Sequence, residues 1–427
     1  MSQGDGTGKA RPRVVIIGGG FGGLSAARAL RHAPVEVVLL DRRNHHVFQP
    51  LLYQVATAGL SPGDIASPIR WILRKHRNLH VWLAEVTAID PARRVVRLAD
   101  GEVSYDFLIV AAGATHAYFG HDEWRPHAPG LKTLEDALDM RRRVLLAFEE
   151  AERARDRHVQ RRLLTFVVIG GGPTGVELAG SLAEISRHAL ANDFRAIDPE
   201  SARIILIEGG SAVLPTYPAE LSQFARQALE RLGVAVWTGS VVTDVSPGRV
   251  RVGDETIEAG TVLWAAGVSA SPLGASLGVP LDRAGRVIVP DDLTVPGHPE
   301  ISVVGDLAAF RTADGGWLPG VAQVAMQQAA HAAANITRRI AGQPTRPFVY
   351  RNLGNLATIG RNSAVADLPR LRMKGLPAWL FWLFVHVFNL IGFRNRLSVM
   401  IQWASSYMTY QRSVRLITGD DEWHARA

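Results

Sequence analysis

Two glycine-rich loops with the spacing G-x-G-x-x-G occur in this chain of 427 residues. Each follows an apolar run typical of a buried strand, residues 14–17 and 166–169, and precedes helix-forming sequence, residues 24–30 and 176–184. The first glycine of this spacing makes a tight turn, the second lets the main chain approach a pyrophosphate, and the third lets helix pack on strand. The anion then binds at the helix N-terminus. Two such loops predict two dinucleotides, between which electrons can pass. The spaced glycines are Gly18, Gly20 and Gly23 in the first loop and Gly170, Gly172 and Gly175 in the second.

An acidic residue ends the strand that follows each loop. Residues 35–40 lead to Asp41, which lies at about the expected distance of ~20 residues for a carboxylate that binds ribose hydroxyls. Residues 204–207 lead to Glu208 after a longer interval, which we attribute to a helical extension over residues 187–194 plus Asp198-Pro199. Glycines follow Glu208 and no arginine is present to receive a 2′-phosphate, so NADH is favoured over NADPH. A solvated residue at the end of a strand is the alternative for either carboxylate.

The composition excludes several classes of protein. Apolar residues make up 47% and charged residues 20%, as in a globular protein. Cysteine is absent, which excludes disulfide scaffolds, thiolate metal sites and flavoenzymes with a redox-active dithiol; we expect no metal site. The net charge of +7 favours an anionic surface, and because the basic residues are scattered we expect phospholipid and no nucleic acid. Residues 1–13 show no secretory signal, so we expect a cytoplasmic location.

Alternating strand and helix patterns predict an α/β fold with parallel sheets. The strand ending at Gly113 has a near copy ending at Gly267, which implies an internal duplication with one Rossmann-like unit inserted into the other. Helical sequence is expected over residues 135–162 and 320–335. The expected domains are a first dinucleotide-binding domain at residues 1–125 and 286–345, an inserted second one at 126–285, and a C-terminal membrane-associating region at 346–427.

The C-terminal tail is strongly apolar. As a helix, residues 376–393 would reach roughly 27 Å, borderline for crossing a bilayer. His386, Asn389 and the arginines after residue 393 count against a crossing. A second helix is expected over residues 397–410, with tryptophan and tyrosine rings, including Trp403 and Tyr410, suited to lipid headgroups. We therefore expect an amphipathic anchor that lies in the membrane plane, and part of it could also pair two subunits. A buried core or dimer helix is the alternative.

Taken together, these features resemble the flavoproteins with two dinucleotide-binding domains, the pyridine nucleotide-disulfide reductase-like superfamily. Within it, the chain resembles the type II NADH dehydrogenases, the single-subunit NADH:quinone oxidoreductases. The glutamine element and the apolar tail are the most particular to this family. The motifs that carry the resemblance are the paired glycine loops, Pro50-Leu51-Leu52-Tyr53-Gln54, the two strands ending Ala-Ala-Gly, Val304-Gly305-Asp306, Ala322-Gln323-x-x-x-Gln327, Leu356-Ala357-Thr358-Ile359-Gly360 and the tail.

The resemblance implies that FAD occupies the first unit and that NADH, as substrate, binds the second. Asp306 would meet the ribityl chain and pyrophosphate of FAD, although a helix N-cap is equally compatible with it. Gly267 would lie near the nicotinamide. The cofactor-binding residues implied for FAD are Gly18, Gly20, Gly23, Asp41, Gln54, Gly113, Asp306 and Val321, and those for NADH are Gly170, Gly172, Gly175, Glu208 and Gly267.

Four residues are implied in catalysis. Glu177 lies in the first turn after the second loop, near the flavin–nicotinamide contact of the family, and would move protons; simple compensation of the helix dipole is the alternative. Gln323 and Gln327 are four residues apart on an expected helix, so their amides share a face and would bind a quinone carbonyl. Lys374 matches a lysine near the family's quinone tunnel, and a basic residue beside a membrane is about as compatible.

The implied function is a respiratory-chain NADH:quinone oxidoreductase that passes hydride from NADH to FAD and two electrons to a membrane quinone, without proton pumping. It would be a peripheral protein on the cytoplasmic face of the cell membrane. A sulfide:quinone oxidoreductase is excluded because it needs cysteines. A soluble FAD- and NADH-dependent reductase of another electron carrier, or a nucleotide-sensing membrane scaffold with low turnover, are the alternatives.

Overall fold

The computed structural model describes residues 11–391, 393–409 and 414–418. By its internal contacts the chain divides into two compact units, which we call the first and the second unit. The domain boundaries drawn from the sequence remain predictions. The first unit comprises Met1–His46, Ser67–Thr115 and Val268–Arg351, and the second comprises Val47–Ala66, His116–Gly267 and Asn352–Ala427.

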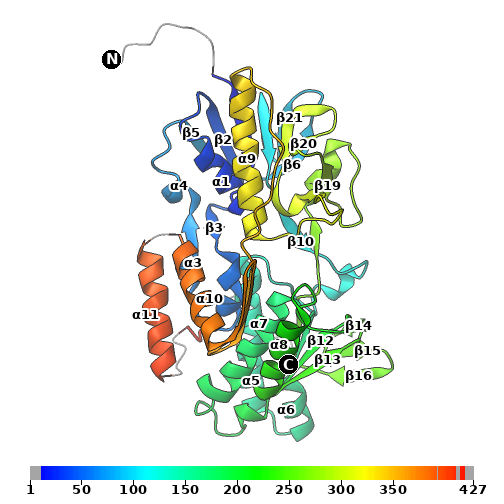
Figure 1. The fold of residues 1–427 in the computed structure, drawn as a ribbon. Coiled ribbons are helices and arrows are strands. Elements are labelled where there is room, and N and C mark those ends of the chain that lie inside the picture. Colours follow the sequence, from blue (N-terminus) through cyan, green and yellow to red (C-terminus); the bar gives the residue numbers. More distant parts are fainter. Residues whose placement is uncertain (1–10, 392, 410–413, 419–427) are drawn as a thin grey trace. The chain divides into compact units, whose positions relative to one another are not determined.

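A six-stranded sheet forms the centre of the first unit, in the order β20-β21-β9-β1-β2-β5. All neighbours are parallel except β20 and β21. Helices α1 (Phe21–Ala29) and α9 (Ala322–Ile340) pack side by side in this unit (Figure 1). The strands are β1 (Arg13–Ile17), β2 (Glu36–Asp41), β5 (Leu79–Leu83), β9 (Phe107–Val110), β20 (Thr294–Val295) and β21 (His298–Val303).

Smaller elements complete the first unit. An antiparallel sheet of β6 (Val86–Asp90), β7 (Val95–Leu98) and β8 (Gly101–Ser104) follows β5. Strand β19 (Val287–Val289) pairs with β22 (Ala308–Phe310). The remaining short elements are α4 (Ile69–Ile72) and the strands near the points where the chain passes between units, β3 (His45–Val47), β4 (Ala66–Pro68), β10 (Ala114–His116) and β18 (Val268–Ala270).

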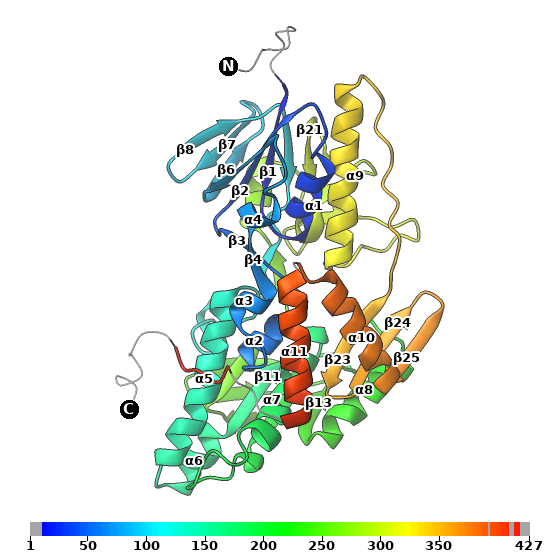
Figure 2. The same cartoon turned by 90° about the vertical axis from the view of Figure 1, so that its left-hand side faces the viewer.

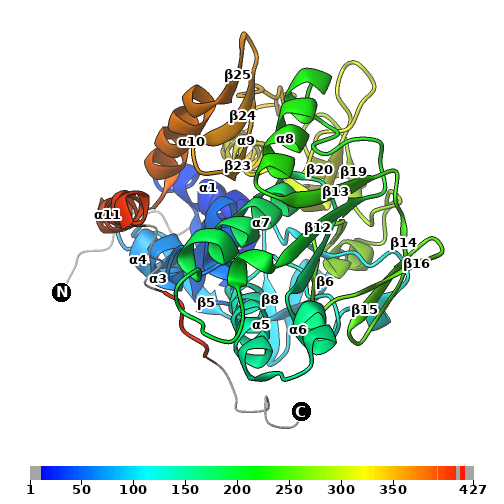
Figure 3. The same cartoon turned by 90° about the horizontal axis from the view of Figure 1, so that it is seen from below.

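The second unit repeats the central pattern of the first in a four-stranded parallel sheet, β13-β12-β11-β17. Helices α7 (Pro173–Glu184) and α8 (Ala219–Arg231) pack against this sheet (Figure 3). Trp264 of β17 contributes to an apolar core with side chains of the antiparallel sheet β14-β15-β16. The strands are β11 (Thr165–Ile169), β12 (Arg203–Glu208), β13 (Val234–Thr238), β14 (Val242–Ser246), β15 (Arg249–Val252), β16 (Glu255–Glu258) and β17 (Thr261–Trp264).

The C-terminal part of the second unit is an antiparallel sheet followed by two helices. Strands β23 (Asn355–Gly360), β24 (Ser363–Leu368) and β25 (Leu371–Gly375) are consecutive neighbours. Helix α10 (Leu376–Asn389) packs against β24 and β25, and α11 (Phe393–Thr409) follows it (Figure 2). Two short helices of the same unit, α2 (Leu52–Ala56) and α3 (Pro62–Ile65), pack against α7 and α11 respectively.

The α/β fold class with Rossmann-type units is confirmed. Several helix limits were wrong. The expected helix 135–162 is two helices, α5 (Leu134–Arg153) and α6 (Arg157–Leu163), because Ala154 is extended and Asp156 caps α6. The tail helix ends at Asn389, where Leu390 turns to an extended conformation, and α9 continues to Ile340.

Two further expectations concern the ends of helices. The extension expected over residues 187–194 is a single π-helical turn, Ile185–Ala189, that continues α7. The second tail helix begins at Phe393, earlier than expected, and Tyr410 lies outside the described residues. None of the helices in the described part of the chain combines the length and apolarity needed to cross a membrane.

Candidate functional site

The first glycine loop has the geometry that a pyrophosphate site requires. Gly18 has a φ of +99°, and a Cβ there would lie 2.4 Å from the Ala111 carbonyl oxygen. A Cβ on Gly23 would lie 1.7 Å from the Gly18 carbonyl oxygen, so α1 can approach β1 only with glycine here. Gly20 precedes α1, has no side-chain cap, and faces open space within 4 Å of its Cβ position. The helix N-terminus is therefore open to an anion.

The second loop repeats this arrangement in the second unit. Gly170 has a φ of +107°, and a Cβ on Gly175 would lie 1.8 Å from the Gly170 carbonyl oxygen. Gly172 precedes α7 without a side-chain cap and again faces open space. The residues present therefore fit a dinucleotide phosphate in each unit.

The carboxylate at the end of each strand accepts a main-chain hydrogen bond from the glycine loop of its own unit. In the first unit, the Gly19 N–H donates to Asp41 Oδ2 (2.5 Å) and the Arg43 N–H to Oδ1 (2.7 Å). In the second, the Gly171 N–H donates to Glu208 Oε2 and the Gly210 N–H to Oε1, both at 2.6 Å. A carboxylate oxygen can accept more than one hydrogen bond, so both acids retain capacity for ribose hydroxyls.

Sequence reasoning missed two buried side chains beside the first loop and the Gly-Asp turn. His46 Nδ1 lies 3.1 Å from the Gly19 carbonyl oxygen, and burial lowers the His46 pKa to about 4, so the ring is neutral. Gln328, fully buried, accepts from the Gly305 N–H at 2.8 Å, while its Nε2 lacks a hydrogen-bond partner within the described ranges. The sequence signals were a histidine five residues after Asp41 and a glutamine next to Gln327.

The other implied cofactor residues lie at element ends. Asp306 is in a 3-10 turn, Gly305–Leu307, after β21, and Val321 precedes α9. Gly113 has a φ of +68° and open space at its Cβ position. A Cβ on Gly267 would lie 2.6 Å from the Phe119 ring, so the chain passes close to that ring. Their roles in binding remain predictions.

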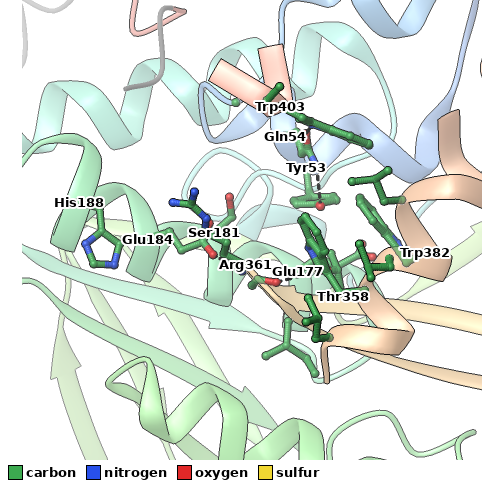
Figure 4. A pocket seen from close by; sticks show the side chains of 18 of the residues that line it. Tyr53, Gln54, Glu177, Ser181, Glu184, His188, Thr358, Arg361, Trp382 and Trp403 are labelled. Atoms are coloured by element: carbon green, nitrogen blue, oxygen red, sulfur yellow. Dashed lines mark hydrogen bonds between the residues drawn. The ribbon is translucent and has the colours of Figure 1, made fainter. Parts of the chain in front are cut away.

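A cavity of about 660 Å³ lies within the second unit (Figure 4). One side is polar and is formed mainly by α7 and its π turn. The other side is apolar and is formed by α10 and α11. The polar lining residues are Tyr53, Gln54, Glu177, Ser181, Glu184, His188, Thr358 and Arg361, and the large apolar ones are Leu376, Trp379, Leu380, Trp382, Leu383, Met400 and Trp403.

Glu177 is half-buried in the wall of this cavity. Desolvation of its carboxyl group by the surrounding residues raises its pKa well above the usual value. A hydrogen bond from the Thr358 main chain acts in the opposite direction and is the smaller effect. A carboxyl group with a raised pKa keeps its proton at a higher pH than an ordinary carboxyl group does.

Gln54 connects the polar and apolar sides of the cavity. Its Oε1 accepts from Trp403 Nε1 of α11, and its Nε2 donates to the Tyr53 hydroxyl, both at 2.8 Å. Trp403 in turn stacks at a tilt against Trp382 of α10, with ring centroids 5.5 Å apart. The structure thus places Gln54 at the cavity wall, and its implied cofactor contact remains a prediction.

The other three implied catalytic residues are not among the residues that line this cavity. Gln323 and Gln327 lie on α9 in the first unit, where the Gln327 amide both donates to and accepts from the Arg351 main chain at 3.0 Å. Lys374 Nζ lies 2.6 Å from Glu220 Oε1 in an exposed ion pair. Their roles in quinone binding remain predictions.

Comparison with known proteins shows which family this chain is similar to. A family model described as pyridine nucleotide-disulphide oxidoreductase matches residues 12–334, and one described as the NDH2 C-terminal domain matches residues 352–411. The chain is similar to the type II NADH:quinone oxidoreductase Ndh of Mycobacterium tuberculosis, with 46% identity over 432 residues, 97% of this chain and 92% of that protein. It is 31% identical over 409 residues to the demethylphylloquinone reductase NdbB of a Synechocystis species, covering 92% and 96%.

A solved structure has the same fold. The NDH2 of Plasmodium falciparum in complex with NADH superposes with a TM-score of 0.87 at 21% identity, covering 96% of this chain and 100% of that one. The fold and the two loops define a flavoprotein of the pyridine nucleotide-disulphide oxidoreductase class. More particularly, the chain belongs to the type II NADH:quinone oxidoreductase family, which confirms the resemblance drawn from the motifs.

Proposed function

We propose that this chain oxidises NADH and reduces a quinone, with FAD as its resident cofactor and without proton pumping. The observation that carries this proposal is the pair of open phosphate loops in a chain that also encloses a cavity with one polar and one apolar side. FAD, when bound, supplies hydride acceptance and two-electron transfer. The protein residues bind the nucleotides, exclude water and hold protons.

We assign the loop of the first unit to FAD. Gly18, Gly20 and Gly23 would hold its pyrophosphate, Asp41 the adenosine ribose and Asp306 the ribityl chain. The buried donor of Gln328 beside the Gly305–Asp306 turn supports this assignment, because a bound polar group would satisfy it. Gly170, Gly172, Gly175 and Glu208 would hold NADH in the second unit.

The test is an absorption spectrum of the purified protein. We expect a bound flavin spectrum that NADH bleaches and that a short-chain quinone restores, with turnover when both substrates are present. A protein that retains no flavin would contradict the cofactor assignment. Bleaching by NADH without reoxidation by quinone would instead indicate a different acceptor or a nucleotide sensor.

We also propose that the protein lies on an anionic membrane surface through α10 and α11. On α10, Ala378, Trp382 and His386 face inward at four-residue intervals. Between them a stripe of large apolar side chains is exposed, and α11 adds to it. Such a stripe is typical of a helix lying in the headgroup region, and the net charge of +7 favours anionic lipid. The exposed side chains are Leu376, Leu380, Phe384, Phe388, Leu397, Met400 and Ile401.

Liposome flotation tests the membrane proposal. We expect binding to anionic vesicles that the double substitution Phe384→Ser and Phe388→Ser weakens, while Val349→Ser, at an exposed valine of the first unit, leaves it unchanged. Equal flotation of all three proteins would refute the assignment. Because NADH is an intracellular reductant, we place the enzyme on the cytoplasmic face. Part of the stripe can also pair two copies, which sedimentation of the wild type against the double variant would measure.

A further inference from the structure

Phe119 is an exposed aromatic residue in a backbone conformation that such residues avoid. Its φ is +54°, in the left-handed region, and its side chain is 69% exposed. In that region the Cβ atom comes too close to the following carbonyl oxygen, so a bulky residue there is an outlier. Of the non-glycine residues with a positive φ in the described ranges, Phe119 is the only aromatic one.

The turn around Phe119 is held by the neighbouring residues and not by its ring. The Ala117 N–H donates to the Gly267 carbonyl oxygen at 3.2 Å, and the Ala117 carbonyl oxygen accepts from Trp264 Nε1 at 2.9 Å. Tyr118 is buried, stacks on Trp264 with ring centroids 4.9 Å apart, and donates from its hydroxyl to a main-chain carbonyl oxygen at 2.8 Å. A strained residue whose own side chain buries so little apolar surface indicates a functional role.

The Phe119 ring lies directly against Gly267. A Cβ on Gly267 would lie 2.6 Å from the ring Cζ and 3.3 Å from Cε2. Gly267 does not itself have a positive φ, so glycine is required here for the space that the ring occupies and not for its own backbone conformation. The ring also approaches Trp264 at a tilt, with centroids 6.2 Å apart. One side of the ring therefore rests on the end of β17, and most of the remainder is open.

This position continues the path that a dinucleotide follows along the parallel sheet. Ligands bind such sheets outside the carboxyl ends of the strands, and β12, β11 and β17 are consecutive neighbours. Glu208 ends β12, the glycine loop that begins at Gly170 follows β11, and Gly267 follows β17. A Cβ on Gly170 would lie 2.5 Å from the Ala265 carbonyl carbon, so the loop contacts the segment that leads to Gly267. With adenosine at β12 and pyrophosphate at β11, the other half of NADH reaches the end of β17.

We propose that the Phe119 ring packs against the nicotinamide riboside of NADH at the carboxyl end of β17. The nicotinamide ring offers a planar face on which an aromatic side chain can stack, and its positive charge in NAD⁺ adds a cation–π attraction. An aromatic ring on a turn that is already fixed loses little conformational freedom when the substrate binds. This inference rests on the proposed binding of NADH in the second unit and adds a substrate-binding residue to it.

ADP distinguishes this role from an effect on the phosphate loop. ADP carries the adenosine and two phosphates but lacks the nicotinamide riboside, and β12 lies two strand spacings, roughly 10 Å, from β17. We therefore expect substitutions of Phe119 to weaken the binding of NAD⁺ and to leave that of ADP unchanged. Calorimetric titration of the purified, oxidised holoenzyme measures both dissociation constants without turnover.

Phe119→Leu removes the planar ring but keeps an apolar side chain, whereas Phe119→Tyr keeps the ring. We expect the Kd for NAD⁺ to rise about tenfold in Phe119→Leu and less than about twofold in Phe119→Tyr. Leu371→Ala, at an exposed leucine of the same unit, is the matched control and should bind both ligands as wild type does. An unchanged or lower Kd for NAD⁺ in Phe119→Leu, or an equal weakening of ADP, would overturn the assignment. A wild-type protein that does not bind NAD⁺ would instead overturn the proposed NADH site.

Thermal unfolding separates substrate binding from a role in folding. Phe119→Asn removes the ring and places at this position a residue that tolerates the left-handed conformation better. We expect its melting temperature to equal or exceed that of wild type, while its Kd for NAD⁺ rises about tenfold as in Phe119→Leu. A lowered melting temperature with wild-type NAD⁺ affinity would show that the ring serves the fold and would overturn the proposal.

Discussion

Asp64 clamps helix α11, and its removal should loosen that helix locally. The carboxylate is almost completely buried on α3. Its Oδ1 accepts from Ser398 Oγ at 2.8 Å, and its Oδ2 accepts from Gln402 Nε2 at 3.0 Å and from the Ser61 N–H at 2.8 Å. Two of these three bonds come from α11, so the substitution Asp64→Asn breaks the clamp while it preserves the shape of the side chain.

The size of the effect follows from those two bonds. Hydrogen bonds to a charged group contribute about 1.5–3 kcal/mol each, and the lower end applies because the released α11 donors become hydrated. Asparagine also presents an N–H group to one of these donors. We therefore expect a loss of about 2 kcal/mol in the free energy of opening α11, roughly a 30-fold rise in the detached population.

Hydrogen exchange followed by mass spectrometry measures this opening. Peptides covering α11 should exchange roughly 30-fold faster in Asp64→Asn, and about tenfold faster in Ser398→Ala, which loses one bond. Ser61→Ala keeps its main-chain N–H and both α11 bonds, and should exchange as wild type does. Unchanged exchange in Asp64→Asn, or an equal rise across α7, would refute the local clamp.

Three shorter predictions concern the cofactor loops and buried titratable groups. Glu208→Ala should raise the KM for NADH by roughly 10- to 100-fold, because the loop and ribose lose a charged acceptor; an unchanged KM would remove it from the site. The pKa of Glu177 is raised in the folded protein, so above pH 4.5 the folded protein keeps a proton that the unfolded chain has lost. The free energy of unfolding therefore falls as the pH rises. In thermal unfolding the advantage of Glu177→Gln over wild type should then grow above pH 4.5, and a constant difference would contradict this. Burial lowers the pKa of His386 from 6.5 to about 4. As the pH falls from 6.5 to 4 the unfolded chain is protonated first, so the free energy of unfolding decreases by up to about 3 kcal/mol. His386→Gln should flatten this acid loss, measured by denaturant unfolding at pH 7 and pH 4.

The parallel strands and both phosphate loops could be predicted because their signals are local. The apolar run before Gly18 and the glycine spacing determine a strand, a turn and a helix without reference to distant residues. Element limits were less certain, since the break at Ala154 between α5 and α6 has no glycine or proline to mark it. Asp156, which caps the N-terminus of α6, is the residue that could have indicated a new helix. The charged pattern around it reads as one continuous helix, so the cap was not recognised.

The cavity could not be predicted because it depends on contacts between distant residues. A Cβ on Gly180 would lie 1.6 Å from the Ile359 carbonyl oxygen, so β23 lies directly on α7 at that glycine. Sequence spacing identified Glu177 but gave no reason to pair it with a strand far along the chain. The Asp64 clamp is likewise formed by residues whose partners are separated by more than three hundred positions.

Helix α7 joins the second glycine loop to the cavity within the second unit. Its N-terminus, after Gly172, faces the open space suited to a phosphate, and Glu177 follows five residues later. At about 1.5 Å per residue, this is roughly 7.5 Å along the helix axis. Further along, Gly180 holds α7 against β23, so one continuous helix carries the glycine loop at its start, Glu177 in the cavity wall and the contact with β23.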